Sequence, residues 1–249
     1  MAVPAQGLQL TSPRLLVVTA VAPEAAAVLR GVRTANGHHA ETPRPPLPGG
    51  YALTACGPVD VVVAGVGPAA AAAATATALA LAPDAGYALA VSAGIAGGFA
   101  PAAPLGCAVV AEAMVAADLG AETPDGFTDV ASLGFGRVRH DCPQADDVVR
   151  ALRGHGLRTA TGPVLTVSTV TGSAERAAEL LRRHPGVVAE AMEGFGVAEA
   201  AAGHGVPVLE LRTVSNAVGP RDRAAWRIGE ALDALAGVFA ALPYATLVK

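Results

Sequence analysis

Two acidic residues, Glu190 and Glu193, stand three positions apart in the last third of the chain, and Met192 lies beside the second of them. An ionised carboxylate carries only acceptors, so it can take hydrogen bonds from two adjacent hydroxyl groups, such as those of a ribose. Met192 adds a soft apolar surface. The pattern predicts a sugar-binding acid at the start of a helix, with a solvated pair on a helix surface as the alternative.

A second chemical signal, Ser215 and Asn216, follows the apolar segment 206–214. An amide side chain carries both a donor and an acceptor. Asn and Gln read the edge of a purine that holds N7 and the 6-substituent, and an amide NH₂ group can serve both acceptors of a 6-oxopurine. Asn216 is therefore a candidate for purine recognition, and a turn-forming asparagine after a strand is the alternative.

Glu24 and the segment 92–98 could complete such a site from the first half of the chain. Glu24 follows the apolar run 15–20 by four residues, and Pro23 is suited to open a helix there. The segment 92–98 has three glycines and no side chain larger than Ile95, which predicts a loop whose backbone N–H groups a ligand can approach. The alternatives are an acid placed by the helix dipole and a tight turn.

Strands and helices alternate along the chain, which predicts an α/β fold with a mixed central sheet. In α/β sheets of this kind, ligands bind at the carboxyl ends of the strands. The segment 118–142 is expected to form a long loop over the site. Expected strands are 15–20, 51–56, 59–66, 88–93, 108–114, 163–169, 187–189 and 206–214. Expected helices are one from Pro23 and those at 68–81, 145–154, 173–183 (with Ser173 as N-cap), 193–203 and 224–241.

Composition excludes several other classes of protein. The 249 residues suit one domain, 1–249, and we expect its first segment, 1–13, to be flexible. Only 15% of the residues are charged, and the net charge of −4 argues against a nucleic-acid partner. The uncharged run 61–83 is interrupted at 65–68, and no signal peptide is evident, so we expect a cytoplasmic protein without membrane contact. Neither a metal-ligand spacing nor a dinucleotide or P-loop motif occurs, so we expect no metal and no cofactor.

Taken in order, these motifs resemble the purine nucleosidase and nucleoside phosphorylase superfamily. The segment 94–98 resembles the Gly-Ser-Ala-Gly-Gly segment of the methylthioadenosine/adenosylhomocysteine nucleosidases, Met192-Glu193 resembles their Met-Glu ribose clamp, and 212–216 resembles their Arg-Ala-Ile-Ser-Asp. The resemblance implies a single-domain, three-layer α/β sandwich. It also implies a small nucleoside and water as the reactants and a homo-oligomer, either a dimer or a dimer of dimers.

The resemblance also implies roles for individual residues. Glu24 would activate the attacking water, Asn216 would stabilise the departing purine, and Glu193 would hold the ribose hydroxyls. Further substrate-binding residues are expected at Ile95, Ala96, Gly97, Thr169, Val170, Met192, Arg212, Ser215, Arg221 and Arg223.

Departures from the nucleosidase pattern narrow the choice of base and of nucleophile. Asn216 replaces an aspartate that protonates adenine, and Thr169 replaces an aromatic residue that stacks on the base. Ile95 replaces a serine and no arginine lies near the glycine segment, which favours hydrolysis over phosphorolysis.

The segments 190–194 and 215–223, with Trp226, most resemble the futalosine hydrolases of menaquinone biosynthesis, which release hypoxanthine, a 6-oxopurine. Arg221 or Arg223 would then meet the substrate's benzoate. A methylthioadenosine-type nucleosidase, an inosine-type phosphorylase and a non-catalytic nucleoside-binding protein remain alternatives.

Overall fold

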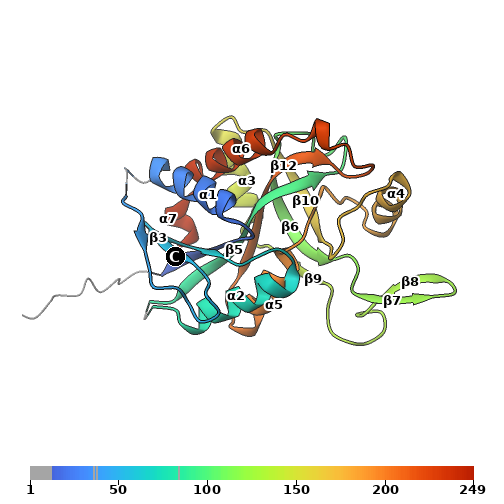
Figure 1. Ribbon diagram of the computed structural model, residues 1–249, viewed down its shortest axis with the longest axis horizontal. Helices are drawn as coiled ribbons and strands as arrows, with labels where there is room; N and C mark the ends of the chain where they lie inside the picture. The colour runs from blue at the N-terminus through green and yellow to red at the C-terminus, as the bar shows by residue number, and fades with distance from the viewer. Residues whose placement is uncertain (1–12, 36, 38, 84) are drawn as a thin grey trace, which may run out of the picture.

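A ten-stranded sheet forms the middle layer of the molecule (Figure 1). The computed structural model describes residues 13–249 except 36, 38 and 84. Residues 1–12 of the segment expected to be flexible, 1–13, therefore lie outside the described residues. The strands of this sheet are β1 (Arg14–Thr19), β2 (Thr42–Pro43), β3 (Leu53–Cys56), β4 (Val59–Val63), β5 (Tyr87–Gly98), β6 (Ala108–Ala116), β9 (Arg139–Asp141), β10 (Thr159–Thr166), β11 (Ala189–Ala191) and β12 (Val208–Ala217).

Both parallel and antiparallel pairs occur, as the sequence predicted. The order is β11-β10-β6-β12-β5-β1-β4-β3-β2, with β9 added to β6. The inner strands β4, β1, β5 and β12 are parallel to one another, whereas β3 pairs with β4 and β12 with β6 in the antiparallel sense. Strand β1 is buried along its whole length, because helices cover both faces of the sheet there.

The sheet closes on itself at one end. Strand β11 runs parallel to β10, but it also pairs in the antiparallel sense with the end of β5, so that Glu190 lies opposite Gly97. Strand β12 ends beside the same part of β5, with Asn216 opposite Gly97. The last residues of β5, β11 and β12 therefore meet, although they are far apart in the sequence.

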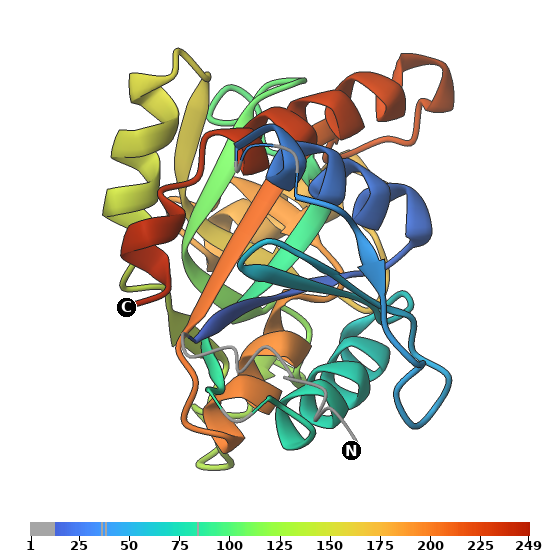
Figure 2. The same cartoon turned by 90° about the vertical axis from the view of Figure 1, so that its left-hand side faces the viewer.

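Helices form the two outer layers, which confirms the three-layer sandwich (Figures 1 and 2). Helix α1 packs on α6 on one side of the sheet, and α2 packs on α5 on the other. The side chain of Ser173 caps α4 by accepting a hydrogen bond from the Arg176 N–H, as predicted. The helices are α1 (Ala22–Ala35), α2 (Pro68–Ala80), α3 (Ala145–Gly154), α4 (Ala174–Arg183), α5 (Gly194–Gly203), α6 (Ile228–Ala240) and α7 (Tyr244–Leu247).

The segment 118–142 is not the loop that the sequence suggested. It contains the hairpin of β7 (Gly120–Thr123) and β8 (Gly126–Asp129), and then β9, which extends the sheet at β6. The hairpin projects from the body of the molecule (Figure 1). Its short turn is closed by the Thr123 hydroxyl, which donates to the Gly126 carbonyl. Polar, glycine-containing strands of four residues do not stand out in a sequence from the turns around them.

Five further boundaries differ from expectation. The glycine segment 92–98 belongs to β5 and is not a loop, and β12 continues through Ser215 and Asn216. Strand β10 ends at Thr166, so that Thr169 lies beyond it, and the strand expected at 187–189 is β11. The helix expected at 224–241 is a short 3₁₀ turn, Arg223–Ala225, and α6, because Trp226 between them is extended.

The uncharged run 61–83 is divided between β4 and α2. Across the described part of the chain, no helix has both the length and the apolar character needed to cross a membrane.

Candidate active site

Glu24 lies in the first turn of α1, and its carboxylate is buried at the end of β1. One oxygen accepts from the Ala20 and Val21 N–H groups at 3.0 and 3.3 Å, and the other accepts from the Ile95 N–H at 2.9 Å. Burial raises the pKa of Glu24 above its usual value, while nearby Arg212 and the Ile95 N–H pull the pKa down. A glutamate with a raised pKa is the stronger base, so this carboxylate is suited to take a proton from water.

Glu193 lies at the N-cap position of α5, and its carboxylate also reaches the N-terminus of α2. Its Oε1 accepts from the Gly67 N–H at 3.3 Å, and its Oε2 lies 3.1 Å from Nη1 of Arg212. The N-terminal ends of helices favour negative charge. The structure thus holds a buried carboxylate between two helix ends and a guanidinium, where it can present its remaining acceptor sites to hydroxyl groups.

Arg212 joins these two acids from the middle of β12. Its Nη2 donates to the Ser92 hydroxyl at 2.9 Å, and its Nε donates to Glu210 at 2.9 Å. The expectation that no arginine lies near the glycine segment is wrong, because β12 pairs with β5 and places Arg212 opposite Gly94. The guanidinium is buried and engaged by protein groups, so Arg212 holds the carboxylates in place.

The glycines of β5 make room for this cluster. A Cβ atom at Gly94 would collide with the carboxylate of Glu24 and lie 2.9 Å from Nη1 of Arg212. The backbone N–H of Ile95 is engaged by Glu24, so it is not free for a ligand. The segment therefore differs from the expected ligand-binding loop: its small residues let side chains from α1 and β12 approach each other across a strand.

Three consecutive residues of β5 connect the acidic cluster to a neighbouring cavity. Ile95 contacts Glu24, the Ala96 carbonyl lies 3.2 Å from the Ser215 hydroxyl, and Gly97 lines the cavity. The Ser215 hydroxyl also lies 2.9 Å from Oδ1 of Asn216, while Nδ2 of Asn216 donates to the Ala217 carbonyl at 3.0 Å. Ser215 thereby orients the amide and leaves one N–H of Asn216 available at the cavity.

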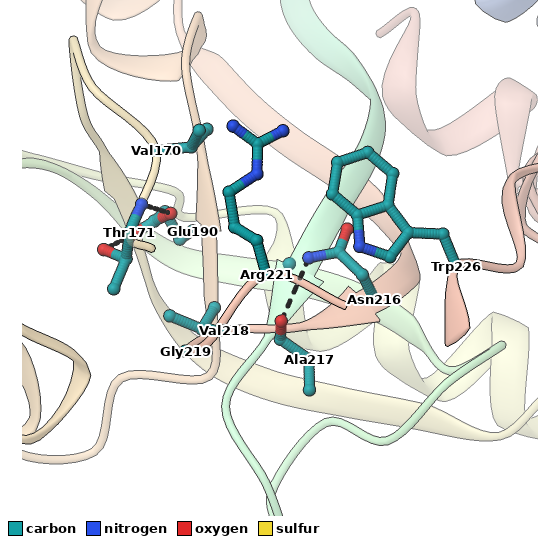
Figure 3. A pocket seen from close by; sticks show the side chains of 10 residues that line it. Val170, Thr171, Glu190, Asn216, Ala217, Val218, Gly219, Arg221 and Trp226 are labelled. Atoms are coloured by element: carbon teal, nitrogen blue, oxygen red, sulfur yellow. Dashed lines mark hydrogen bonds between the residues drawn. The ribbon is translucent and has the colours of Figure 1, made fainter. Parts of the chain in front are cut away.

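The cavity lies where β5, β11 and β12 meet, and Figure 3 shows its lining. The guanidinium of Arg221 extends between Val170 and Trp226, and it lies 5.3 Å from the centre of the Trp226 ring. On the opposite side, Thr171 donates from its N–H to Glu190 at 2.8 Å and also from its hydroxyl. The lining residues are Gly97, Val170, Thr171, Glu190, Asn216, Ala217, Val218, Gly219, Arg221 and Trp226.

The structure separates two of the expected binding residues, Thr169 and Arg223, from this arrangement. Thr169 is exposed beyond the end of β10, and Arg223 is exposed on the 3₁₀ turn. Met192 is half-buried beside Glu193. Neither Thr169 nor Arg223 is among the residues that line the cavity, whereas Val170 and Arg221 are.

Sequence reasoning missed Thr171 and Glu210, and it gave Glu190 and Trp226 no place in the site. Nothing in the sequence distinguishes Thr171. A signal for Glu210 was present, because residues two apart on a strand point to the same face and Arg212 was already a candidate. Burial raises the pKa of Glu190 above its usual value, although both of its hydrogen bonds from Thr171 oppose this effect.

Comparison with known proteins places the chain among enzymes that act on nucleosides. A family model described as the phosphorylase superfamily matches residues 14–247. The futalosine hydrolase of Streptomyces coelicolor is 58% identical over 228 residues, which cover 89% of this chain and 91% of that protein. The futalosine hydrolase of Acidothermus cellulolyticus is 48% identical and covers 93% of this chain and 91% of its own length.

Solved structures share the fold at low sequence identity. The futalosine hydrolase of Helicobacter pylori matches with a TM-score of 0.76 and 17% identity over 92% of this chain and 97% of that one. A methylthioadenosine nucleosidase mutant from the same organism, solved with 5′-methylthioadenosine in its active site, matches with a TM-score of 0.75 and 17% identity, over 91% of this chain and 96% of the other. Because both are equally distant in sequence, these two matches establish the fold and do not discriminate between the two activities.

Proposed function

The chain belongs to the phosphorylase superfamily, and from that premise we propose that it hydrolyses the N-glycosidic bond of futalosine. Hypoxanthine and the dehypoxanthinyl ribose compound are the products. The observation that carries this proposal is the buried cluster in which Glu24 and Glu193 flank one guanidinium, beside a cavity lined by Asn216. Two relatives that are 58% and 48% identical over most of the chain are futalosine hydrolases, which supports the choice of substrate.

The reaction breaks the bond between C1′ of the ribose and N9 of the purine. The bonding electron pair leaves with the base, and positive charge develops on the ribose. Glu193 accepts hydrogen bonds from the ribose hydroxyls, and Glu24 takes a proton from the water whose oxygen bonds to C1′. The free N–H of Asn216 donates to the edge of the departing purine anion and stabilises the charge that collects there. The anion then takes up a proton from solvent to become hypoxanthine, and Glu24 returns its proton to solvent.

The charges in the site favour water over phosphate as the nucleophile. Three carboxylates, those of Glu24, Glu193 and Glu210, surround the single guanidinium of Arg212. Its nitrogen atoms are already directed to Glu210, Glu193 and Ser92. A phosphate dianion placed in this cluster would meet like charges, and the guanidinium of Arg212 is already engaged, which is unfavourable in a site of low dielectric constant.

The decisive experiment is an incubation of the protein with futalosine, inosine and methylthioadenosine, each with and without phosphate. We expect hypoxanthine from futalosine at a rate that phosphate does not change. Release of adenine from methylthioadenosine as the fastest reaction would assign a methylthioadenosine-type nucleosidase. A requirement for phosphate would assign a phosphorylase. No free base from any substrate after prolonged incubation would leave a nucleoside-binding protein.

Arg221 is the arginine that we propose for the benzoate of the substrate. Its side chain lines the cavity, whereas that of Arg223 does not. In the structure its guanidinium covers one face of the only tryptophan, Trp226. When Arg221 turns toward the carboxylate, that aromatic face becomes free to contact the base, which would replace the stacking residue missing at Thr169.

Arg221→Gln should raise KM for futalosine by about tenfold, because a charge-assisted hydrogen bond is worth roughly 1.5–3 kcal/mol. KM for inosine, which has no benzoate, should change little in the same variant. Arg223→Gln is the matched control, and we expect it to behave as the wild type toward both substrates. Equal losses on both nucleosides, or a larger loss in Arg223→Gln, would contradict the assignment.

The cellular setting belongs to the same proposal. We propose that the enzyme is cytoplasmic, acts as a homo-oligomer and serves menaquinone biosynthesis, which is the setting that its resemblance to futalosine hydrolases implies. The mass of the native particle in solution and the menaquinone content of a strain that lacks the protein are the corresponding measurements. An active enzyme that is a monomer would contradict the homo-oligomer. An unchanged menaquinone content would contradict the role in menaquinone biosynthesis.

A further inference from the structure

Glu210 is a buried acid that the mechanism above does not use. It lies on β12 two residues before Arg212, and its side chain has no solvent-exposed surface. Its Oε1 accepts from Nε of Arg212 at 2.9 Å. Its Oε2 has no hydrogen-bond partner among the described residues. A buried carboxylate that leaves one oxygen unpaired is costly to fold, so a role beyond packing is worth seeking.

The carboxylate lies directly beneath the start of α5. A Cβ atom at Gly194, the first residue of α5, would collide with the Glu210 carboxylate, so only glycine allows this approach. Gly194 follows Glu193 in the chain. The titratable or charged groups that face Glu210 are Arg212 and Glu193, and the thiol of Cys142. Glu210 does not line the cavity, so it has no direct contact with the site proposed for the base.

The guanidinium of Arg212 is planar, and its N–H groups have a fixed geometry. A hydrogen bond at Nε therefore determines where the two terminal nitrogens point. With Nε held by Glu210 and Nη2 held by Ser92, Nη1 is aimed at Oε2 of Glu193, 3.1 Å away. The hydrogen bonds that Nε and Nη2 make on the other edges of the guanidinium thus determine the direction of Nη1.

We propose that Glu210 is a positioning residue that orients Arg212 and, through Arg212, holds Glu193 in place for the ribose. This inference rests on the proposed function, because it assigns Glu210 to the same reaction. It also accounts for the closely packed Gly194, since the carboxylate has to reach Arg212 from beneath the helix that carries Glu193.

Burial raises the pKa of Glu210 to about 7, with Arg212 opposing that effect and Glu193 adding to it. The charge on Glu210 therefore changes near neutral pH. Above this pKa the ionised group holds Arg212 by a charge-assisted bond, and below it the bond weakens. The wild type should accordingly show a component near pH 7 in its pH–rate profile, with activity rising as the pH rises, and Glu210→Gln should lack that component.

The main test is a double-mutant cycle on kcat/KM for futalosine with Glu210→Gln, Glu193→Gln and the double variant. If Glu210 acts through Glu193, Glu210→Gln should lose about tenfold in the wild-type background and almost nothing when Glu193 is already Gln. Losses that multiply would overturn the proposal. As a second readout, Glu210→Gln should lose much less activity on a 2′-deoxy analogue of futalosine, which lacks a hydroxyl for Glu193 to hold.

Asp60→Asn provides a matched control for the loss of a buried ion pair. Asp60 lies 2.8 Å from Arg14, and both side chains are only 5% exposed. We expect Asp60→Asn to lower the midpoint of thermal unfolding while leaving kcat/KM of the folded protein unchanged. If Glu210→Gln fails to fold, Glu210→Asp takes its place in the cycle, with the same expected coupling to Glu193 and the same overturning result.

The failure of this inference can be told from failure of the proposed function. If the wild type releases no base from futalosine, the proposed function fails. If the wild type releases hypoxanthine but the losses of Glu210 and Glu193 variants multiply, only the positioning role fails.

Discussion

Glu24→Gln should lower kcat for futalosine by at least about 10²-fold while the protein still folds, because a general base typically contributes about 10²–10⁴-fold. The amide keeps the shape of the side chain and can still accept from the Ile95 N–H, but it cannot take a proton from water. The measurement is steady-state release of hypoxanthine, with circular dichroism and thermal unfolding to verify the fold. A variant that retains near wild-type kcat would leave Glu24 as a residue that caps the end of β1.

Glu175→Gln is the matched control for this substitution. Glu175 also lies in the first turn of a helix, α4, but its side chain is exposed to solvent and does not line the cavity. We expect it to leave kcat unchanged. Since burial raises the pKa of Glu24, the base should become protonated, and activity should fall, at a higher pH than for an ordinary glutamate. This acidic limb should be absent from the residual activity of Glu24→Gln.

The elements that carry the site could be predicted from local patterns. Buried strands such as β1 read as continuous apolar runs because helices cover both faces of the sheet. Pro68 and Ser173 mark where α2 and α4 begin, since each satisfies or removes a donor that the first turn leaves unpaired. Among the site residues, Glu24, Glu193 and Asn216 could be chosen by their chemistry and by resemblance to a known family.

Long-range pairing was the part that the sequence could not supply. The antiparallel contact of β11 with β5 brings Glu190 to Gly97. Strand β11 has only three residues, and nothing in their sequence indicates this pairing. The glycine segment looked like a loop because glycines are usual in turns, whereas here their missing side chains admit Glu24 and Arg212. The guanidinium of Arg212 contacts both Glu210 and Glu193 because of the register of β12 on β5, which only the folded sheet determines.

Asn216→Asp should move the preference of the enzyme from 6-oxopurine toward 6-aminopurine nucleosides and lower its total activity. In the wild type, the Asn216 amide is held by Ser215 and Ala217, and its remaining N–H can donate to the hypoxanthine edge. An aspartate would place a lone pair against O6 but could accept from a 6-amino group. Sites that hydrogen-bond a substrate reject the analogue that leaves a buried polar group unpaired, so the ratio of the two kcat/KM values should change by about 10²-fold or more.

The comparison requires kcat/KM for futalosine and its 6-amino counterpart on the wild type, Asn216→Asp and Asp222→Asn. The last variant reverses the same acid–amide exchange nearby, at a side chain that caps the 3₁₀ turn by accepting from the Ala224 N–H. It should leave the ratio of the two substrates as in the wild type, because Asp222 does not line the cavity. A ratio that Asn216→Asp does not change, or a wild type that prefers the amino compound, would mean that a group other than Asn216 reads the base. Glu190, which lines the same cavity and like Asn216 lies opposite Gly97 of β5, would then be the next residue to substitute.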